Sequence, residues 1–163
     1  MKKMVVAGVI VTSWMLACLL AIAAELPAIP PIPEKFKNIQ IVKPNPSVPK
    51  EVADFSGEWE GVWKYVGQIG QFTYLSFGQE TRRVKLIVYE VSANKIKILY
   101  GWGESPFGRG KAGWRLFESD IMDDNGKKRF SFIGAGRMGF YLEDGILKGT
   151  AGGYYETEMK RVK

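Results

Sequence analysis

The sequence predicts an all-β fold, a small antiparallel meander barrel of about eight or nine short strands. From about residue 53 onward, short runs alternate apolar and polar residues without a trustworthy stretch of helical period. Gly, Asn and Asp interrupt these runs at close intervals, which is typical of hairpin connections. Run after run has one apolar and one polar face, which favours a sheet that closes on itself and leaves no free edge.

Each strand is expected between two such interruptions. The Asn125-Gly126 and Asp144-Gly145 pairs tolerate the positive φ of two-residue hairpins, and Ser92 to Asn94 form a tight polar bend. In the first strand Trp59, Gly61, Trp63 and Tyr65 share one face. The expected strands are 56–66, 70–78, 82–91, 95–101, 113–121, 127–134, 137–143, 146–151 and 153–162.

The N-terminus has the pattern of an export signal, expected over residues 1–24. Lys2 and Lys3 precede an uncharged apolar run from Met4 to Ala24 that ends in small residues, so cleavage is expected after Ala23 or Ala24. Two alternatives stay open. Cys18 follows an imperfect lipoprotein box and would then be acylated, or the run is kept as an anchor, since it is long enough to span a bilayer. Cleavage, acylation and a retained anchor all place the rest of the chain in the periplasm or outside the cell.

A Pro-rich linker is expected over residues 25–52, before a barrel domain over 53–163. Seven of the eight prolines of the chain lie in the linker. Proline at this density favours an extended, polyproline-like tether. We interpret the linker as a spacer that holds the domain away from the membrane.

Composition excludes several classes of chemistry. The chain has no histidine, and its only cysteine lies in the expected signal, so histidine-based catalysis, the usual zinc sites and disulfides are excluded. Without Lys2 and Lys3 the balance is 21 Lys and Arg against 17 Asp and Glu, a mild excess that does not predict nucleic-acid binding. No cofactor and no metal site is expected.

The irregular stretch from 101 to 114 is the candidate ligand-binding loop at the barrel mouth. Its glycines formally match a dinucleotide-binding motif, but a strand is expected after it where that motif requires a helix. It also lacks the Ser or Thr that follows the lysine of a phosphate loop. Irregular backbone combined with aromatic rings and cations is typical of a binding loop, and a plain connection is the alternative. The candidate residues are Trp102, Phe107, Arg109, Lys111 and Trp114.

Carboxylates give one further candidate, Glu118. Glu118 and Asp120 share a face with Trp114 and Leu116, so either a bulge shifts the register after Leu116, which we favour, or one carboxylate points inward with a raised pKa. The pairs Glu58/Glu60 and Glu156/Glu158 fall on polar faces. The acidic residues at 120–125 do not have calcium-loop spacing, and hairpin chemistry explains them.

Phe55-Ser56-Gly57-Glu58-Trp59, followed by Gly61-Val62-Trp63, resembles the Gly-x-Trp opening strand of the calycin barrels, which include lipocalins, avidins and fatty-acid-binding proteins. The resemblance extends to a last strand in which Thr157, Met159 and Arg161 share a face. It implies a barrel closed at one end by Trp59, Trp63 and Arg161, with a ligand at its mouth. A small bacterial domain family with similar Gly and Trp signals also resembles this chain and implies no activity.

The sequence therefore predicts an exported, non-enzymatic barrel domain that binds a small molecule or glycan at its mouth. The 19 aromatic residues expected in the domain favour a filled interior and recognition at the rim. A structural or protein-interaction role in the cell envelope, with envelope proteins as partners, is the alternative. A carboxylate-based hydrolase is the third hypothesis. Membrane contact is expected only through the N-terminal segment.

Overall fold

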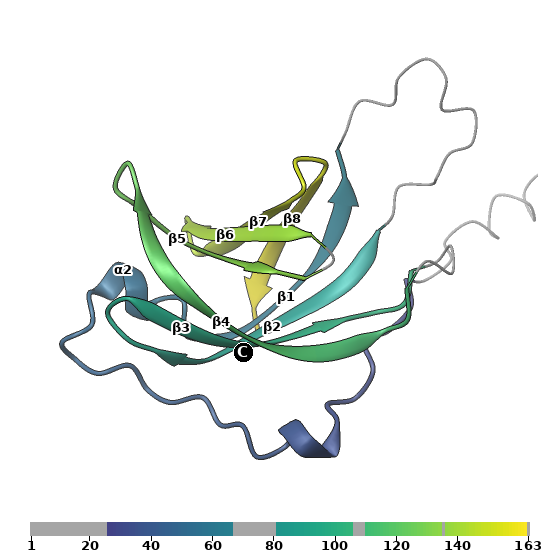
Figure 1. Cartoon of the computed structure of the whole chain (residues 1–163), viewed down its shortest axis with the longest axis horizontal. Coiled ribbons are helices and arrows are strands. Elements are labelled where there is room, and N and C mark those ends of the chain that lie inside the picture. Colours follow the sequence, from purple (N-terminus) through teal and green to yellow (C-terminus); the bar gives the residue numbers. More distant parts are fainter. Residues whose placement is uncertain (1–25, 67–80, 106–109, 135, 163) are drawn as a thin grey trace, which may run out of the picture.

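The structure is a computed structural model that describes residues 26–66, 81–105, 110–134 and 136–162. Eight antiparallel strands form one closed barrel in which each strand pairs with its neighbour in sequence and β8 returns to β1. Two short helices precede the barrel (Figure 1). The elements are η1 (Glu34–Phe36), α2 (Lys50–Ala53), β1 (Gly57–Tyr65), β2 (Arg82–Val91), β3 (Lys95–Trp102), β4 (Gly113–Asp124), β5 (Lys127–Ile133), β6 (Arg137–Glu143), β7 (Ile146–Ala151) and β8 (Tyr155–Arg161).

The predicted meander barrel is confirmed, and eight of the expected strands match β1 to β8 within about three residues. The ninth, expected over 70–78, lies outside the described residues. Barrel closure does not need it, because β1 pairs with both β2 and β8. The turn chemistry is confirmed as well: Asn125 and Gly126, like Asp144 and Gly145, adopt positive φ in two-residue hairpins. The Gly126 amide also donates to Asp123 Oδ1, 2.7 Å away, so this carboxylate serves the turn.

One end of the barrel is closed, and we call it the closed end. It contains α2 and the turns that follow β2, β4 and β6 (Figure 1). Trp59 is 1% exposed there, and its indole donates to the Phe55 carbonyl at 2.9 Å. The Arg161 guanidinium lies 4.2 Å from the centre of the Trp59 ring and donates to the carbonyls of Asp54 and Ser56. This arrangement joins the last strand to the first. Trp63, which was expected to close the same end, lies at the opposite end of the barrel, because it is four residues further along β1.

Aromatic rings fill the interior, as the sequence predicts. Phe55 meets Phe130 edge-on at 5.2 Å, and Phe130 stacks on Phe140 at 5.3 Å. Phe140 stacks on Phe132 at 5.5 Å, and Phe132 stacks on Phe117 at 4.2 Å. The rings therefore form a continuous column along the barrel.

Residues 26–49, which we call the strap, lie along the outside of the barrel (Figure 1). The Trp114 indole donates to the Pro30 carbonyl at 2.8 Å, and the Val42 amide donates to the Tyr89 carbonyl at 2.7 Å. Tyr89 is the unpaired residue of a bulge between β2 and β3, so its carbonyl is free to accept this bond. The strap is extended, as its prolines predict, but it packs on the barrel instead of hanging free. Val52, just after it, belongs to the core.

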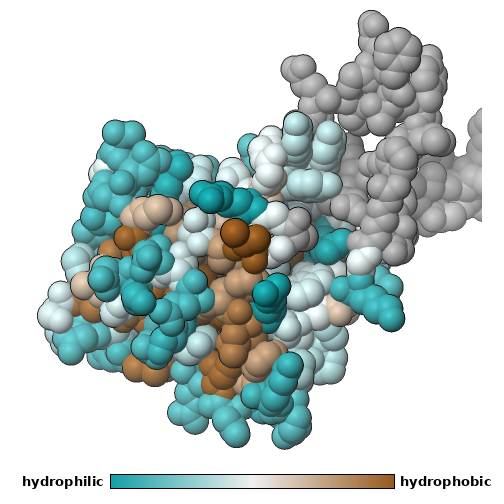
Figure 2. Space-filling view, in the orientation of Figure 1, coloured by the Kyte–Doolittle hydropathy of each residue, from teal (hydrophilic) through white to brown (hydrophobic). Residues whose placement is uncertain are grey.

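The strap covers apolar side chains that point outward. Ile87 and Leu99 lie on the outer face by strand alternation, yet they are 6% and 1% exposed. An outward side chain is buried only when something lies over it, and the strap runs along this face (Figure 1). Elsewhere the surface is mixed, and Figure 2 shows an apolar strip between hydrophilic side chains on one face.

The hydrogen bond between Trp114 and Pro30 can be removed to test whether it holds the strap on the barrel. Replacing Trp114 with Phe keeps a ring on the sheet but removes the donor to Pro30, so we expect the free energy of unfolding to fall by about 0.5 to 1.5 kcal/mol. The strap should also become easier to cleave with a protease. Urea unfolding and limited proteolysis measure the two effects. Unchanged values in both assays would show that the strap does not depend on this bond.

Candidate functional site

The opposite end of the barrel, which we call the open end, carries a pocket of about 190 Å³. Strands β1, β3, β5 and β7 end at this end of the barrel, and β2, β4, β6 and β8 begin there. Inward side chains near the strand ends form its wall, with a ring or an aliphatic chain on most sides. The lining residues are Trp63, Arg82, Tyr100, Gly136, Met138, Ala151, Gly152 and Tyr155. The volume fits a small ring or a short chain.

Tyr100 is the polar centre of this pocket. The Trp63 indole N–H can only donate, so the Tyr100 oxygen accepts in the 2.8 Å hydrogen bond between them. The Tyr100 proton is then left to donate elsewhere. Burial raises the pKa of Tyr100 to about 12, against the opposing effects of the Trp63 bond and the Arg82 charge. The hydroxyl is therefore a neutral donor near neutral pH.

Trp102, the first candidate from the loop, packs against the core. Its ring stacks on Tyr100 with centroids 5.6 Å apart, and its indole donates to the Lys111 carbonyl at 2.8 Å. Trp102 therefore continues the inward face of β3 and supports Tyr100 from the side. The Lys111 side chain is exposed at the open end. Phe107 and Arg109, the other two candidates within the loop, lie outside the described residues.

Trp114 and Glu118 point outward, so the structure does not bring them together with Trp102. The pairing of β3 with β4 runs from Lys95 and Asp120 to Trp102 and Gly113 without a register shift. The expected bulge after Leu116 is therefore wrong. Sequence reasoning took Trp114 and Leu116 as a core face, but they lie on the outside, and the strap accepts a bond from Trp114 there.

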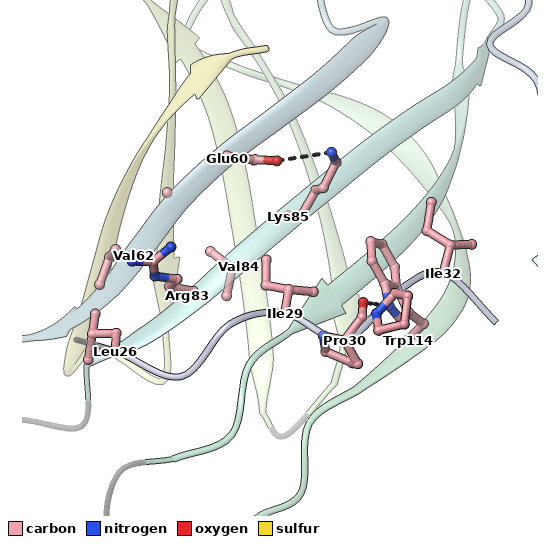
Figure 3. Close-up of a pocket in the computed structure, with 12 residues that line it drawn as sticks. Leu26, Ile29, Pro30, Ile32, Glu60, Val62, Arg83, Val84, Lys85 and Trp114 are labelled. Carbon is pink, nitrogen blue, oxygen red and sulfur yellow. Dashed lines mark hydrogen bonds and ion pairs between the residues drawn. The ribbon is translucent and has the colours of Figure 1, made fainter. Parts of the chain in front are cut away.

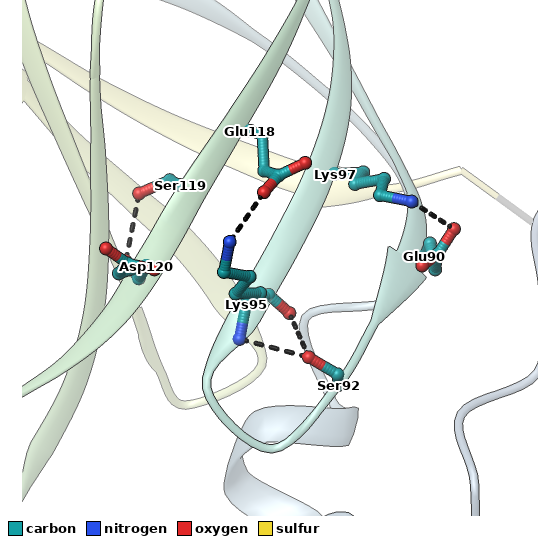
Figure 4. A network of polar contacts seen from close by, with 7 residues as sticks. All are labelled: Glu90, Ser92, Lys95, Lys97, Glu118, Ser119 and Asp120. Carbon is teal, nitrogen blue, oxygen red and sulfur yellow. Dashed lines mark hydrogen bonds and ion pairs between the residues drawn. The ribbon is translucent and has the colours of Figure 1, made fainter.

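The inward carboxylate is also wrong. Glu118 and Asp120 are exposed on the outer face, and the Lys95 ammonium lies 2.9 Å from Glu118 (Figure 4). Lys95 lowers the pKa of Glu118 through its hydrogen bond and its charge. The inward position between them belongs to Ser119, whose hydroxyl donates to the Ser131 carbonyl at 2.8 Å. Glu118 is part of a solvated ion pair and takes no part in the pocket.

A wider groove of about 620 Å³ lies on the outside, between the start of the strap and strands β1 and β2 (Figure 3). Leu26 and Ile29 face it from the strap, and Val62 and Arg83 from the strands. Along its floor the Lys85 ammonium lies 2.8 Å from Glu58 and 2.9 Å from Glu60. Burial lowers the pKa of Lys85, but the bonds and charges of the two carboxylates outweigh it, so the pKa is raised. On the groove floor Lys85 is thus paired with two carboxylates.

Sequence reasoning missed Tyr100 and Arg82 as pocket residues. Tyr100 lies on the apolar inward face of β3, and its hydroxyl at the loop end of that face is the signal that points to a site. Arg82 starts β2 at the open end. Its position across the pocket from Met138 and Ala151 depends on barrel closure and has no local signal.

Two features are absent from the described residues. No group of three or more His, Cys, Asp or Glu among them is placed to hold a metal ion. In the same part of the chain, no helix has the length and apolar character needed to cross a membrane.

No protein-family model matches this chain, and no curated protein does. Two solved structures are similar in outline. A de novo designed fluorescence-activating β-barrel is 16% identical, covers 71% of this chain and 100% of its own, and gives a TM-score of 0.46. A variant of the fluorescent protein UnaG is 12% identical, covers 69% of this chain and 99% of its own, and gives a TM-score of 0.40. At these identities and scores neither protein indicates what this chain binds.

Proposed function

We propose that this chain is an exported, non-enzymatic barrel domain that binds a small molecule at its open end. The observation that carries the proposal is the Tyr100 hydroxyl, which lines a pocket with mainly apolar walls and is neutral near neutral pH. Its oxygen accepts the Trp63 bond, so its proton can be donated to a ligand oxygen in the pocket.

The lining defines the class of ligand. Trp63, Met138 and Ala151 offer apolar contact, and Arg82 adds a positive charge to the lining. The ligand we propose therefore has a small aromatic or aliphatic body and one acceptor oxygen, as in a carboxylate or another acidic group. Export rests on the N-terminal sequence pattern alone.

Benzoate is a suitable probe, because it combines one small aromatic ring with an anionic oxygen group. We expect it to bind saturably to the folded full-length protein, as measured by isothermal titration calorimetry. Ala151→Trp should fill the pocket and weaken binding at least about tenfold, equivalent to about 1.4 kcal/mol. Thr150→Trp is the matched control, because it adds the same ring at the neighbouring, exposed position of β7.

Tyr100→Phe tests the donor separately. It removes the hydroxyl with little change in shape, and it also leaves the Trp63 indole without its acceptor. We therefore expect about a three- to tenfold loss of affinity together with a lower melting temperature. Melting temperatures show whether each variant is folded. Equal probe affinity for the Ala151→Trp and Thr150→Trp proteins would exclude the open-end pocket, and would favour the interaction role in the envelope.

A further inference from the structure

The open end carries the most exposed apolar side chains of the described barrel. Ile133 at the end of β5 is 69% exposed, Tyr154 in the turn after β7 is 58% exposed, and Val66 just after β1 is 50% exposed. Their backbones belong to three separate strand ends that the closed barrel brings to one rim. Exposed large apolar residues on a common rim indicate a contact surface.

Basic residues surround the same rim. Six of the described residues at or near the strand termini of the open end are cationic, and two, Glu104 and Glu156, are acidic. At the closed end, acidic and basic residues are mixed and form ion pairs with one another, as Asp123 does with Lys128, Asp124 with Arg129 and Glu143 with Lys127. The six cationic residues are Lys64, Arg82, Arg83, Lys111, Arg115 and Arg137.

The strap brings the chain to this rim. Leu26 lies beside Val62 and Arg83 near the open end, and α2 lies at the other end (Figures 1 and 3). The Pro27 carbonyl approaches Gly103 so closely that a Cβ there would lie 2.6 Å from it. The hydrogen bond from the Trp114 indole to the Pro30 carbonyl holds the strap on the barrel three residues further along. Whatever precedes residue 26 therefore joins the domain at its open end.

We infer that the open rim lies on the surface of a membrane that contains anionic lipid. Aromatic and aliphatic side chains among Lys and Arg are the composition of surfaces that settle into the headgroup region. Each Lys or Arg held near an anionic bilayer strengthens binding by about fivefold. The apolar run from Met4 to Ala24 precedes the strap by one residue, so a retained or acylated N-terminus would hold this rim against the lipid. The inference does not depend on a ligand in the pocket.

The test measures which end of the full-length protein meets the bilayer. In a Cys18→Ser background, a polarity-sensitive fluorophore is attached at Ile133→Cys in the open rim or at Met122→Cys near the closed end. Both side chains are exposed and apolar, so the two sites are matched. The protein is reconstituted in phosphatidylcholine vesicles with about a quarter phosphatidylglycerol and with a quencher on the lipid chains. We expect strong quenching at 133 and little at 122.

Charge reversal tests whether the basic residues of the rim contribute to membrane binding. A triple variant should lose most of the quenching at position 133; its changes are Lys64→Glu, Lys111→Glu and Arg137→Glu. In the protein without these three changes, high salt should weaken the quenching at position 133. The control carries the same change of charge at exposed positions away from the rim, as Lys35→Glu, Lys43→Glu and Lys160→Glu, and should keep the quenching. Equal quenching at 133 and 122, or full quenching after reversal of the rim, would overturn the inference. Probe binding in solution reports on the pocket independently.

Discussion

Replacing Trp59 with alanine is expected to lower the free energy of unfolding by about 3 to 5 kcal/mol. The ring is 1% exposed, so its loss leaves a cavity at the closed end that the surrounding strands cannot fill. The change also removes the hydrogen bond to the Phe55 carbonyl and the ring beneath the Arg161 guanidinium. Urea unfolding followed by circular dichroism measures the difference.

Trp114→Ala is the matched control for this change. It removes the same side chain from the outer face, where the ring packs on Gly101 and the strap instead of the core. The control should lose clearly less stability than Trp59→Ala. A Trp59→Ala protein with an unchanged melting temperature would show that this ring does not close the barrel, and the calycin-like account of the closed end would fail.

Phe130→Ala should cost a similar amount, about 3 to 5 kcal/mol. Phe130 is fully buried and joins two parts of the molecule, because it contacts Phe55 beside α2 and Phe140 in the middle of the ring column. Its removal therefore uncouples the closed-end cap from the column as well as leaving a void. Thermal and urea unfolding give the change in stability.

Ile133→Ala, three residues along the same strand, is the control. Its side chain is largely exposed, so the expected change is within about 0.5 kcal/mol. If both changes cost the same, the ring column would not be the main source of stability in this barrel. Probe binding at the open end should survive in the Ile133→Ala protein, since that residue does not line the pocket.

Much of the fold could be predicted because its signals are local. The Asn125-Gly126 and Asp144-Gly145 pairs specify two hairpins through positive φ, which few other residues tolerate. Alternation in β1 specifies that Trp59 and Trp63 point inward, since successive side chains of a strand point to opposite faces. The Trp59 and Arg161 pair could be expected only through the calycin resemblance, because the two residues are a whole barrel apart in sequence.

The alternation of apolar and polar residues led to a wrong prediction of the inward face of β4, for a physical reason. Alternation shows which residues are apolar, but it cannot distinguish a face in the core from an outer face that another segment covers. Trp114 and Leu116 are apolar on the outside, and Trp114 lies under the strap. A Pro-rich composition predicts an extended chain, but it does not predict where that chain docks, because the docking bond to Pro30 comes from a residue 84 positions away.

By itself, the sequence determined the eight strands of the described residues, the turns between them and the aromatic core. These follow from side-chain type and spacing over a few residues. The tertiary structure alone decided that Tyr100 meets Trp63 and Arg82 at the open end, that Glu118 faces solvent, and that exposed apolar and basic residues share one rim. Those arrangements depend on barrel closure, which brings distant strand ends together, and no local pattern encodes such distances.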